Sequence, residues 1–255
     1  MALTYNIILF ILGLTVGSFL NVVISRMDEL KTILTGRSHC PICKEMLSWY
    51  EMIPLLSFLL LRGKCRHCGV KISLQYPIVE IVTGILFLIL FQFFGLSFAL
   101  LFYLILFSVL IVIFVYDLQT NQTPEYFAWF ALLFALIFGW YFTGLSFSQT
   151  LFGGLISGGV LAFLVYGSGE RWMGKGDIKI GAIIGLLAGP KGAVLGLFMA
   201  FVLGAIISVL FLSLKKKTMK ESLPFTPFLI ISALITLLYG NYIISWYTGN
   251  FFSFY

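Results

Sequence analysis

Long apolar runs separated by short polar stretches make up most of this chain. Seven of the runs come close to or exceed the roughly 20 residues that a helix needs to cross a membrane, and an eighth is shorter. With 60% hydrophobic and only 10% charged residues, the composition excludes a soluble globular domain. We therefore predict an all-α polytopic membrane protein with about eight transmembrane helices. The predicted spans are residues 5–25, 78–94, 97–116, 126–143, 150–168, 178–189, 191–214 and 225–246.

The basic residues indicate how these spans are oriented. All lysines and arginines except Lys191 fall within residues 26–71, 171–179 and 215–220, and alternating spans place these three clusters on one side. Positive charge gathers on the cytosolic side of membrane proteins, so both termini are expected outside the cytosol. The same rule explains the formal net charge of +6 without a nucleic-acid partner. The N-terminus lacks the basic region and cleavage site of a signal peptide, so residues 5–25 are expected to stay as the first span.

One long polar insertion, residues 26–77, contains all four cysteines. Its two knuckles, Cys40-Pro41-Ile42-Cys43 and Cys65-Arg66-His67-Cys68, are separated by 21 residues, and such a pair suits one tetrahedral Zn²⁺. A redox-active cysteine pair is the alternative, and disulfides are not expected on the reducing side of the membrane. His39 and His67 adjoin the cysteines, but four thiolates complete the metal shell. We therefore predict a structural zinc site formed by Cys40, Cys43, Cys65 and Cys68.

This insertion divides the chain into three predicted domains. Residues 1–25 form the first transmembrane helix, residues 26–77 the cytosolic zinc-binding domain, and residues 78–255 the main membrane domain. A domain as small as the second has little apolar core, so bound metal is expected to supply much of its folding energy.

Glycines recur at close spacing in several spans, where they let helices approach closely. No strand precedes them, as a nucleotide-binding glycine loop would require. Asn21, near the cytosolic end of the first span, is expected to satisfy a neighbouring backbone group. The packing glycines are Gly13 and Gly17, then Gly153, Gly154, Gly158 and Gly159, then Gly181, Gly185 and Gly189.

Two aspartates stand at the ends of spans. Asp117 follows the third span, and Asp177 opens the short sixth one. The twelve residues 178–189 rise only about 18 Å as a helix, against about 30 Å of hydrocarbon. Asp177 is therefore expected in a locally thinned membrane or in a protein-lined recess, where an ionisable residue is a functional candidate. Gly174 and Gly176 leave room for another backbone beside it, whereas Asp117 by itself also fits a solvated acid at a helix end.

In the predicted topology both aspartates lie at the same face of the membrane. Two carboxylates within a few ångström share one proton. The charged member can then draw a proton from water while the neutral member polarises a peptide carbonyl. No serine, cysteine or histidine constellation competes with this pair as a catalytic site.

The Gly-x-Gly-Asp motif at residues 174–177, with an aspartate that ends an earlier span, resembles the bacterial type IV prepilin leader peptidases. These are membrane aspartic proteases of the GxGD type, and the similarity covers most of the chain. At residues 123–125 this chain has Thr-Pro-Glu where the family usually has Ile-Pro-Asp. Further matches to the family's motifs lie at residues 17–22, 40–43, 53–57, 62–65, 65–68, 76–80 and 224–228.

The resemblance implies an aspartic endopeptidase of the bacterial cytoplasmic membrane. Asp117 and Asp177 would be its catalytic residues, Gly174 and Gly176 would support the catalytic loop, and residues 78–255 would form the peptidase domain. The expected substrates are prepilins or type II secretion-like pseudopilins, cleaved after a glycine on the cytosolic side. Many members of the family then methylate the new N-terminus.

S-adenosylmethionine is the methyl donor that the resemblance implies. Its ligands stay unassigned, and Gly63 and Lys64 are the positions to test first. Several acids are expected to offset the cytosolic lysines when the basic leader binds, namely Asp28, Glu29, Glu45, Glu51 and Glu80. The sequence does not determine the oligomeric state.

Two other functions use the same features. An ion or proton translocator would employ the buried acids as a relay, but it has no role for the cysteine domain. A non-catalytic membrane assembly factor would use that domain to dock partners.

Overall fold

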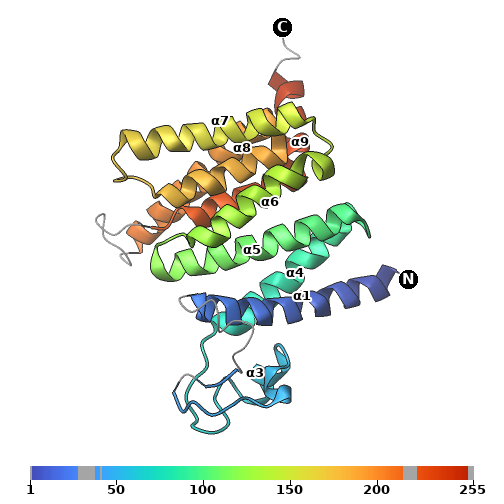
Figure 1. Ribbon diagram of the computed structural model, residues 1–255, viewed down its shortest axis with the longest axis vertical. Coiled ribbons are helices and arrows are strands. Elements are labelled where there is room, and N and C mark those ends of the chain that lie inside the picture. The colour runs from blue at the N-terminus through green and yellow to red at the C-terminus, as the bar shows by residue number, and fades with distance from the viewer. Residues whose placement is uncertain (1, 28–37, 41, 215–222, 252–255) are drawn as a thin grey trace. The chain divides into compact units, whose positions relative to one another are not determined.

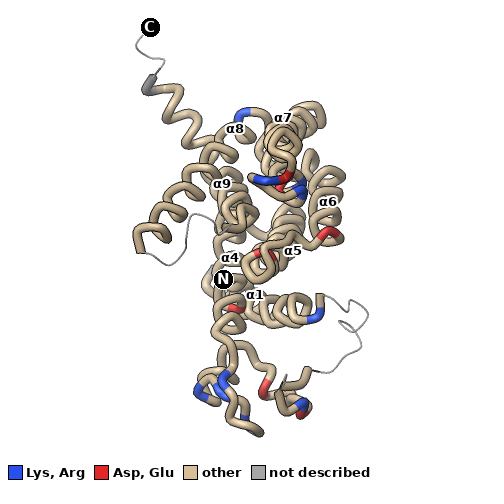
Figure 2. Tube along the Cα trace, turned by 90° about the vertical axis from the view of Figure 1, so that its left-hand side faces the viewer, with Lys and Arg blue, Asp and Glu red and all other residues tan. Residues whose placement is uncertain are grey.

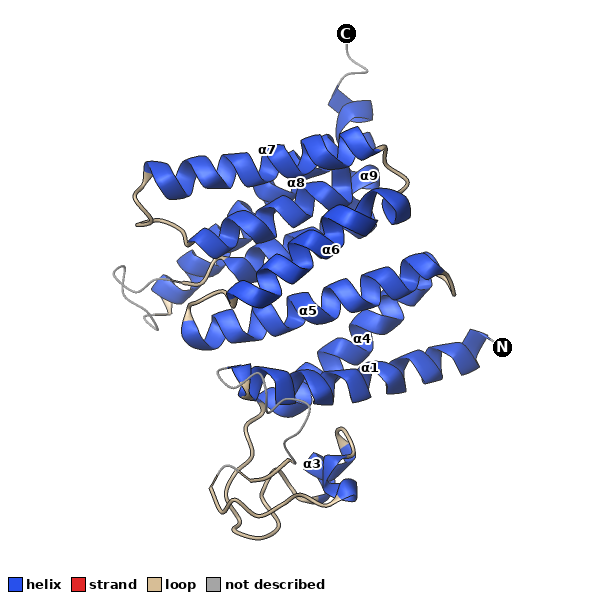
Figure 3. Cartoon of the chain, in the orientation of Figure 1, coloured by secondary structure: helices blue, strands red, loops and turns tan. Residues whose placement is uncertain are grey.

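The computed structural model describes residues 2–27, 38–40, 42–214 and 223–251, and Figure 1 shows it as a set of helices joined by loops. It divides into two compact units, residues 1–112 and 113–255, with the boundary inside α5. No strand occurs among the described residues (Figure 3). The helices are α1 (Ala2–Ser25), the 3-10 helix η2 (Trp49–Met52), α3 (Leu56–Leu60), α4 (Gln75–Phe94), α5 (Phe98–Thr120), α6 (Glu125–Thr143), α7 (Phe147–Gly167), α8 (Lys175–Ser213) and α9 (Thr226–Phe251).

The predicted class, an all-α membrane protein, is confirmed. In the described part of the chain, seven helices are long and apolar enough to span a membrane. They carry few charged residues, and most of the tube in Figure 2 is accordingly tan. The basic cluster predicted at residues 215–220 lies outside the described residues.

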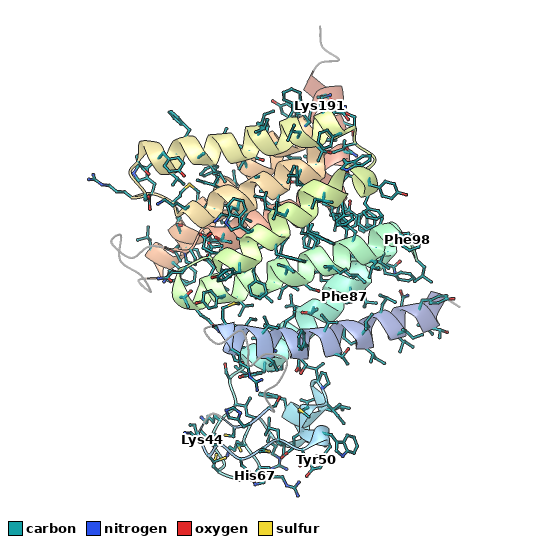
Figure 4. The ribbon with its side chains drawn as sticks, viewed as in Figure 1. Lys44, Tyr50, His67, Phe87, Phe98 and Lys191 are labelled. Carbon is teal, nitrogen blue, oxygen red and sulfur yellow. The ribbon has the colours of Figure 1, made fainter. Side chains whose placement is uncertain are left out.

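The 39-residue helix α8 contains both the sixth and the seventh predicted spans. Its backbone breaks at Gly189, which has φ 68° and ψ −173° and precedes Pro190. A Cβ on Gly196 would overlap Ile184, although a straight helix would separate these positions by about 18 Å. The two halves of α8 therefore fold back on each other as a hairpin, with Lys191 at its turn (Figure 4).

In the second unit, α7 packs on the first half of α8 through glycines, as the sequence predicted. A Cβ on Gly185 would overlap the carbonyl group of Gly153, and a Cβ on Gly158 would lie 3.1 Å from the Ala182 Cβ. Gly159 was also assigned to this contact, but no heavy atom of another element lies within 4 Å of its Cβ position. The packing face therefore excludes Gly159.

Gly185→Ala is expected to destabilise the second unit strongly, because the new methyl group would meet backbone atoms that cannot move aside like a side chain. We expect a loss of folded protein in detergent and a lower melting temperature, corresponding to about 2 kcal/mol or more. Gly159→Ala is the matched control and should leave both unchanged. Equal melting temperatures for the two variants would contradict the packing described here.

In the first unit, α1 and α4 make the same kind of close contact. A Cβ on Gly13 would lie 2.6 Å from the Gly84 Cα, and one on Gly17 would lie 2.8 Å from the Glu80 Cα. The Asn21 side chain donates from Nδ2 to the carbonyl oxygen of Tyr76 at 3.1 Å. The predicted packing role of Gly13 and Gly17 and the backbone role of Asn21 are both confirmed.

Candidate active site and metal centre

Both candidate catalytic acids belong to the second unit and are buried. Asp117 lies in the last turn of α5, which ends when Asn121 adopts φ 53° and donates its N–H to the Asp117 carbonyl at 2.8 Å. Asp177 lies in the first turn of α8. Their exposed fractions are only 4% and 5%. The alternative of a solvated boundary acid at Asp117 is therefore wrong.

Thr226 lies beside both acids. Its Oγ1 donates to Asp177 Oδ1 at 2.8 Å, and Asp117 lies close enough to Thr226 and Asp177 to be influenced by both. Two acids that are sixty positions apart in the sequence therefore come together near one threonine.

The N-terminus of α8 supplies a second partner for Asp177. The backbone N–H of Gly174 donates to Asp177 Oδ2 at 3.1 Å, while Gly174 itself stays extended at φ −82° and ψ 158°. A negative charge is favoured at a helix N-terminus, where free N–H groups and the helix dipole point towards it. Both carboxylate oxygens of Asp177 are thus engaged by donors that suit an ionised group.

Gly176 lies against the loop before α6. A Cβ on Gly176 would overlap the side chain of Thr123. Thr123 in turn places its Oγ1 3.2 Å from Oγ1 of Thr226. The sequence predicted that another part of the chain would pack closely against both glycines. This holds for Gly176 but not for Gly174, whose Cβ position has only one neighbour, Asp177 Oδ2 at 3.9 Å.

The sequence analysis missed the two threonines of this site. Thr226 was noted only as part of the family motif at residues 224–228, and Thr123 only as part of a departure from a family motif. Thr226 is buried, with 1% of its surface exposed. Its signal in the sequence was a hydroxyl residue between two prolines at the very start of a span.

The lysines near the acids have other partners. Lys179 forms an ion pair with Glu125, and its ammonium group lies 4.9 Å from the centre of the Trp129 ring. Lys175 pairs with Glu170 at 2.7 Å between exposed side chains. Among the described residues, the ion-pair partners of these two lysines are therefore glutamates and not Asp117 or Asp177.

The two cysteine knuckles of the first unit have the same backbone geometry. The Cys40 N–H donates to the Glu45 carbonyl at 3.0 Å, and the Cys65 N–H donates to the Val70 carbonyl at 2.8 Å. The residue four positions after the first cysteine has positive φ in each, 57° at Lys44 and 70° at Gly69. Equal local turns thus direct both pairs of thiols inward.

The four sulfur atoms meet at one point. One Sγ from each of Cys40, Cys43, Cys65 and Cys68 lies within 4.8 Å of all the others, and the sulfurs of Cys40 and Cys68 are 3.9 Å apart. A tetrahedral Zn²⁺ with bonds of about 2.3 Å separates its sulfur ligands by about 3.8 Å. Backbone N–H groups of Cys43 and Ile42 lower the pKa of the Cys40 thiol to about 7, which favours the thiolate form that binds metal. The cluster therefore fits a metal ion.

The acids that were expected to meet a basic leader differ in exposure. Glu51 accepts a hydrogen bond from the Ser48 N–H at 2.7 Å, Glu80 accepts one from the Leu55 N–H at 2.9 Å, and both are buried. They bind backbone groups of their own unit, so the expectation fails for these two. Glu45 is exposed, whereas Asp28 and Glu29 lie outside the described residues.

The positions suggested for the methyl donor belong to the turn after α3. Gly63 has φ 67° and donates its N–H to the Phe58 carbonyl at 2.8 Å, and Lys64 is exposed. A Cβ on Gly63 would lie 3.0 Å from the Phe58 ring. The backbone conformation and the nearby Phe58 ring therefore favour glycine at position 63, whether or not a ligand binds there.

Comparison with known proteins assigns both halves of the chain. Residues 11–94 match the bacterial peptidase A24 N-terminal domain, and residues 104–209 match the type IV leader peptidase family. No solved structure gives a significant match.

Several similar proteins carry the name prepilin leader peptidase/N-methyltransferase. The one from Bacillus subtilis is 33% identical, over 94% of this chain and 96% of its own length. The one from Myxococcus xanthus is 37% identical, over 78% of this chain and 64% of its own length. The one from Aeromonas salmonicida is 30% identical, over 96% of this chain and 94% of its own length. Two matched domains and near full-length similarity establish that this chain, a multi-pass membrane peptidase, belongs to the type IV leader peptidase family.

Proposed function

We propose that this protein removes the leader peptides of type IV prepilins or pseudopilins, with Asp117 and Asp177 as its catalytic pair. The observation that carries the proposal is the proximity of the two buried acids, with the Thr226 hydroxyl bound to Asp177 and Asp117 beside them. A peptidase that works without a nucleophilic side chain needs one acid to activate water and a second to protonate the carbonyl oxygen. The names of the similar proteins support prepilins as the substrate.

We assign the shared proton to Asp117. Both oxygens of Asp177 accept hydrogen bonds, Oδ1 from the Thr226 hydroxyl and Oδ2 from the Gly174 N–H, which supports the ionised form of this acid. Asp117 Oδ2 is buried and has no hydrogen-bond partner, which leaves this side of the carboxyl group for the substrate.

The proposed reaction follows from this assignment. Ionised Asp177 takes a proton from a water molecule as the water oxygen attacks the scissile carbonyl, and Asp117 gives its proton to the carbonyl oxygen. The tetrahedral intermediate then collapses: Asp177 passes its proton to the leaving amine, and Asp117 recovers a proton from the intermediate. The pair returns to its starting state with one proton.

The proposed orientation puts this site at the cytosolic membrane face. Thr123 lies against Gly176 and also contacts Thr226. The start of α8, the start of α9 and the loop before α6 therefore gather at one end of the second unit. This agrees with the predicted topology, in which both termini lie outside and the enzyme resides in the bacterial inner membrane. A leader on the cytosolic side of a substrate's apolar segment would reach the acids there.

For the first unit we propose a structural Zn²⁺ bound by the four cysteines. The ion would supply no catalytic step, and its role would be to hold the two knuckles together. Cys65→Ser is expected to reduce the zinc content, measured by mass spectrometry of the purified protein, from about one per chain to below about 0.2, because a missing ligand weakens a structural site severely. His67→Ala should retain full zinc, since His67 is exposed (Figure 4). Zinc loss in His67→Ala would contradict a site made of four cysteines.

We further propose that the new N-terminus is methylated with S-adenosylmethionine, as the names of the similar proteins suggest. No residue of this chain is assigned to the methyl donor. The test of both activities is mass spectrometry of a pilin-like precursor co-expressed with the enzyme. Loss of the leader mass supports the peptidase, and a further 14 Da, roughly one methylene, supports methylation. An unprocessed precursor beside well-inserted enzyme would overturn the proposal.

A further inference from the structure

An apolar segment lies within the long polar insertion of the first unit. Residues 52–61, Met-Ile-Pro-Leu-Leu-Ser-Phe-Leu-Leu-Leu, contain no charged residue and include the end of η2 and all of α3. Their side chains do not form a buried core, since Leu56, Leu59 and Leu60 are 55%, 69% and 81% exposed. Trp49, the first residue of η2, is 74% exposed. So many exposed apolar side chains in one short segment indicate an interaction surface.

One hydrogen bond shows how deep in the membrane this segment lies. The Leu55 N–H, between η2 and α3, donates to Glu80 Oε2 at 2.9 Å. Helix α4 begins at Gln75 and has 20 residues, so it rises about 30 Å, the whole thickness of the hydrocarbon. The backbone of Glu80, five residues after Gln75, therefore lies about 7.5 Å inside the hydrocarbon. Leu55 is thus bound to a residue of the membrane-spanning part of α4.

Glu80 and Leu55 hold each other in place. Glu80 is only 6% exposed, and a carboxylate inside the membrane is costly unless donors such as the Leu55 N–H reach it. Leu55 has φ 60° and ψ −47°, a conformation that residues with a side chain rarely adopt and keep only when their surroundings fix it. The Glu80 carboxylate is therefore the attachment point that keeps the apolar segment beside α4.

The position of α3 in the first unit agrees with this depth. In Figure 1, α1 runs across the view and α3 lies below it, between the positions of its two ends and not beyond them. At this level the surroundings of the protein are lipid chains, which are as apolar as the exposed side chains of the segment.

Basic residues follow the apolar segment directly. Residues 62–71 contain two arginines and two lysines, all exposed, and no acid. Apolar side chains next to a group of basic ones are typical of segments that lie in the membrane interface, where lysine and arginine meet anionic lipid headgroups. Charge and depth therefore favour the same partner, the lipid bilayer.

We propose that residues 49–61 form an interfacial anchor, which inserts its exposed apolar side chains among the lipid chains at the membrane face where α1 ends and α4 begins, with Glu80 as its attachment point. The anchor holds the cysteine cluster at the membrane surface, because Cys65 lies only four residues after its last residue. This role goes beyond the proposed peptidase and methyltransferase activities and does not depend on either.

The test uses the full-length protein in vesicles of phosphatidylcholine and phosphatidylglycerol, with and without bromine atoms on the lipid chains. A fluorescent amino acid replaces Leu60 in one sample and Glu45, an exposed residue of the first cysteine knuckle, in the other. Bromine quenches only fluorophores among the chains, so the fluorescence should fall by at least about half at position 60 and by less than about a tenth at position 45. Position 59, which is 69% exposed, serves if the label at position 60 prevents folding. Equal quenching at positions 60 and 45, or none at position 60, would overturn the anchor.

A pair of Glu80 variants tests the attachment point with the label at position 60. Glu80→Leu removes the acceptor of the Leu55 N–H and should reduce the quenching by at least about half, whereas Glu80→Gln keeps an acceptor oxygen and should stay within about a fifth of wild type. Unchanged quenching in Glu80→Leu would overturn the role of Glu80. Leader cleavage is not the readout, so the anchor and the peptidase proposal can fail independently of each other.

Discussion

Replacing either Asp117 or Asp177 with asparagine is expected to abolish leader removal, with a loss in kcat/KM of about 10³-fold or more. An asparagine at position 177 cannot take a proton from water. An asparagine at position 117 cannot transfer a proton to the carbonyl oxygen and recover it. The measurement is the initial rate of leader cleavage by purified enzyme, with membrane insertion checked by size-exclusion chromatography in detergent.

Glu170→Gln is the control for loss of a nearby negative charge. Glu170 is exposed, belongs to the loop before α8 and forms an ion pair with Lys175. Its variant should cleave within about twofold of wild type, because exposed ion pairs contribute little. Retained cleavage in either aspartate variant would reject the pair. A proton flux in liposomes that depends on both acids, without any cleavage, would favour the translocator in its place.

Gly176→Ala is expected to lower the cleavage rate by about 100-fold, because a misplacement of about 1 Å near a catalytic group has an effect of that size. The new methyl group would overlap Thr123, which contacts Thr226 and through it Asp177. Gly174→Ala should stay within about threefold of wild type. Its backbone is extended, its N–H still reaches Asp177, and its Cβ position is almost free.

The decisive comparison is between these two glycine variants under identical conditions, with the cleavage rate and the amount of folded protein measured together. Thr123→Gly in the Gly176→Ala background removes the overlapping side chain and should restore part of the activity. Equal effects of the two alanine variants would show that the close contact at Gly176 is not what the site requires.

Much of the fold was accessible from the sequence, since the features that encode it are local. An apolar run long enough to cross a membrane predicts a helix wherever it occurs, and the predicted spans agree with the helices to within a few residues at most ends. The short sixth span was also recognised from local features, its length and the Gly189-Pro190 break. That this break turns α8 back on itself became evident only from the contact of Gly196 with Ile184.

The candidate sites divide in the same way. Cysteine spacing is a local property, and it predicted a cluster that the structure assembles within 4.8 Å. The choice of Glu51 and Glu80 as leader-binding acids failed because their partners are backbone N–H groups brought near by folding. The sequence shows where the acidic residues are, but it does not show which of their carboxylates accept hydrogen bonds within the folded protein.

By itself, then, the sequence determined the membrane class, the spans, the cysteine cluster and the choice of two candidate acids. Their common neighbour was decided by the tertiary structure, since Thr226 belongs to a different helix from either acid and lies beside them only when α5, α8 and α9 pack together. Hydropathy and spacing act over a few residues, whereas the approach of two acids to one threonine depends on contacts between residues that are far apart in the chain.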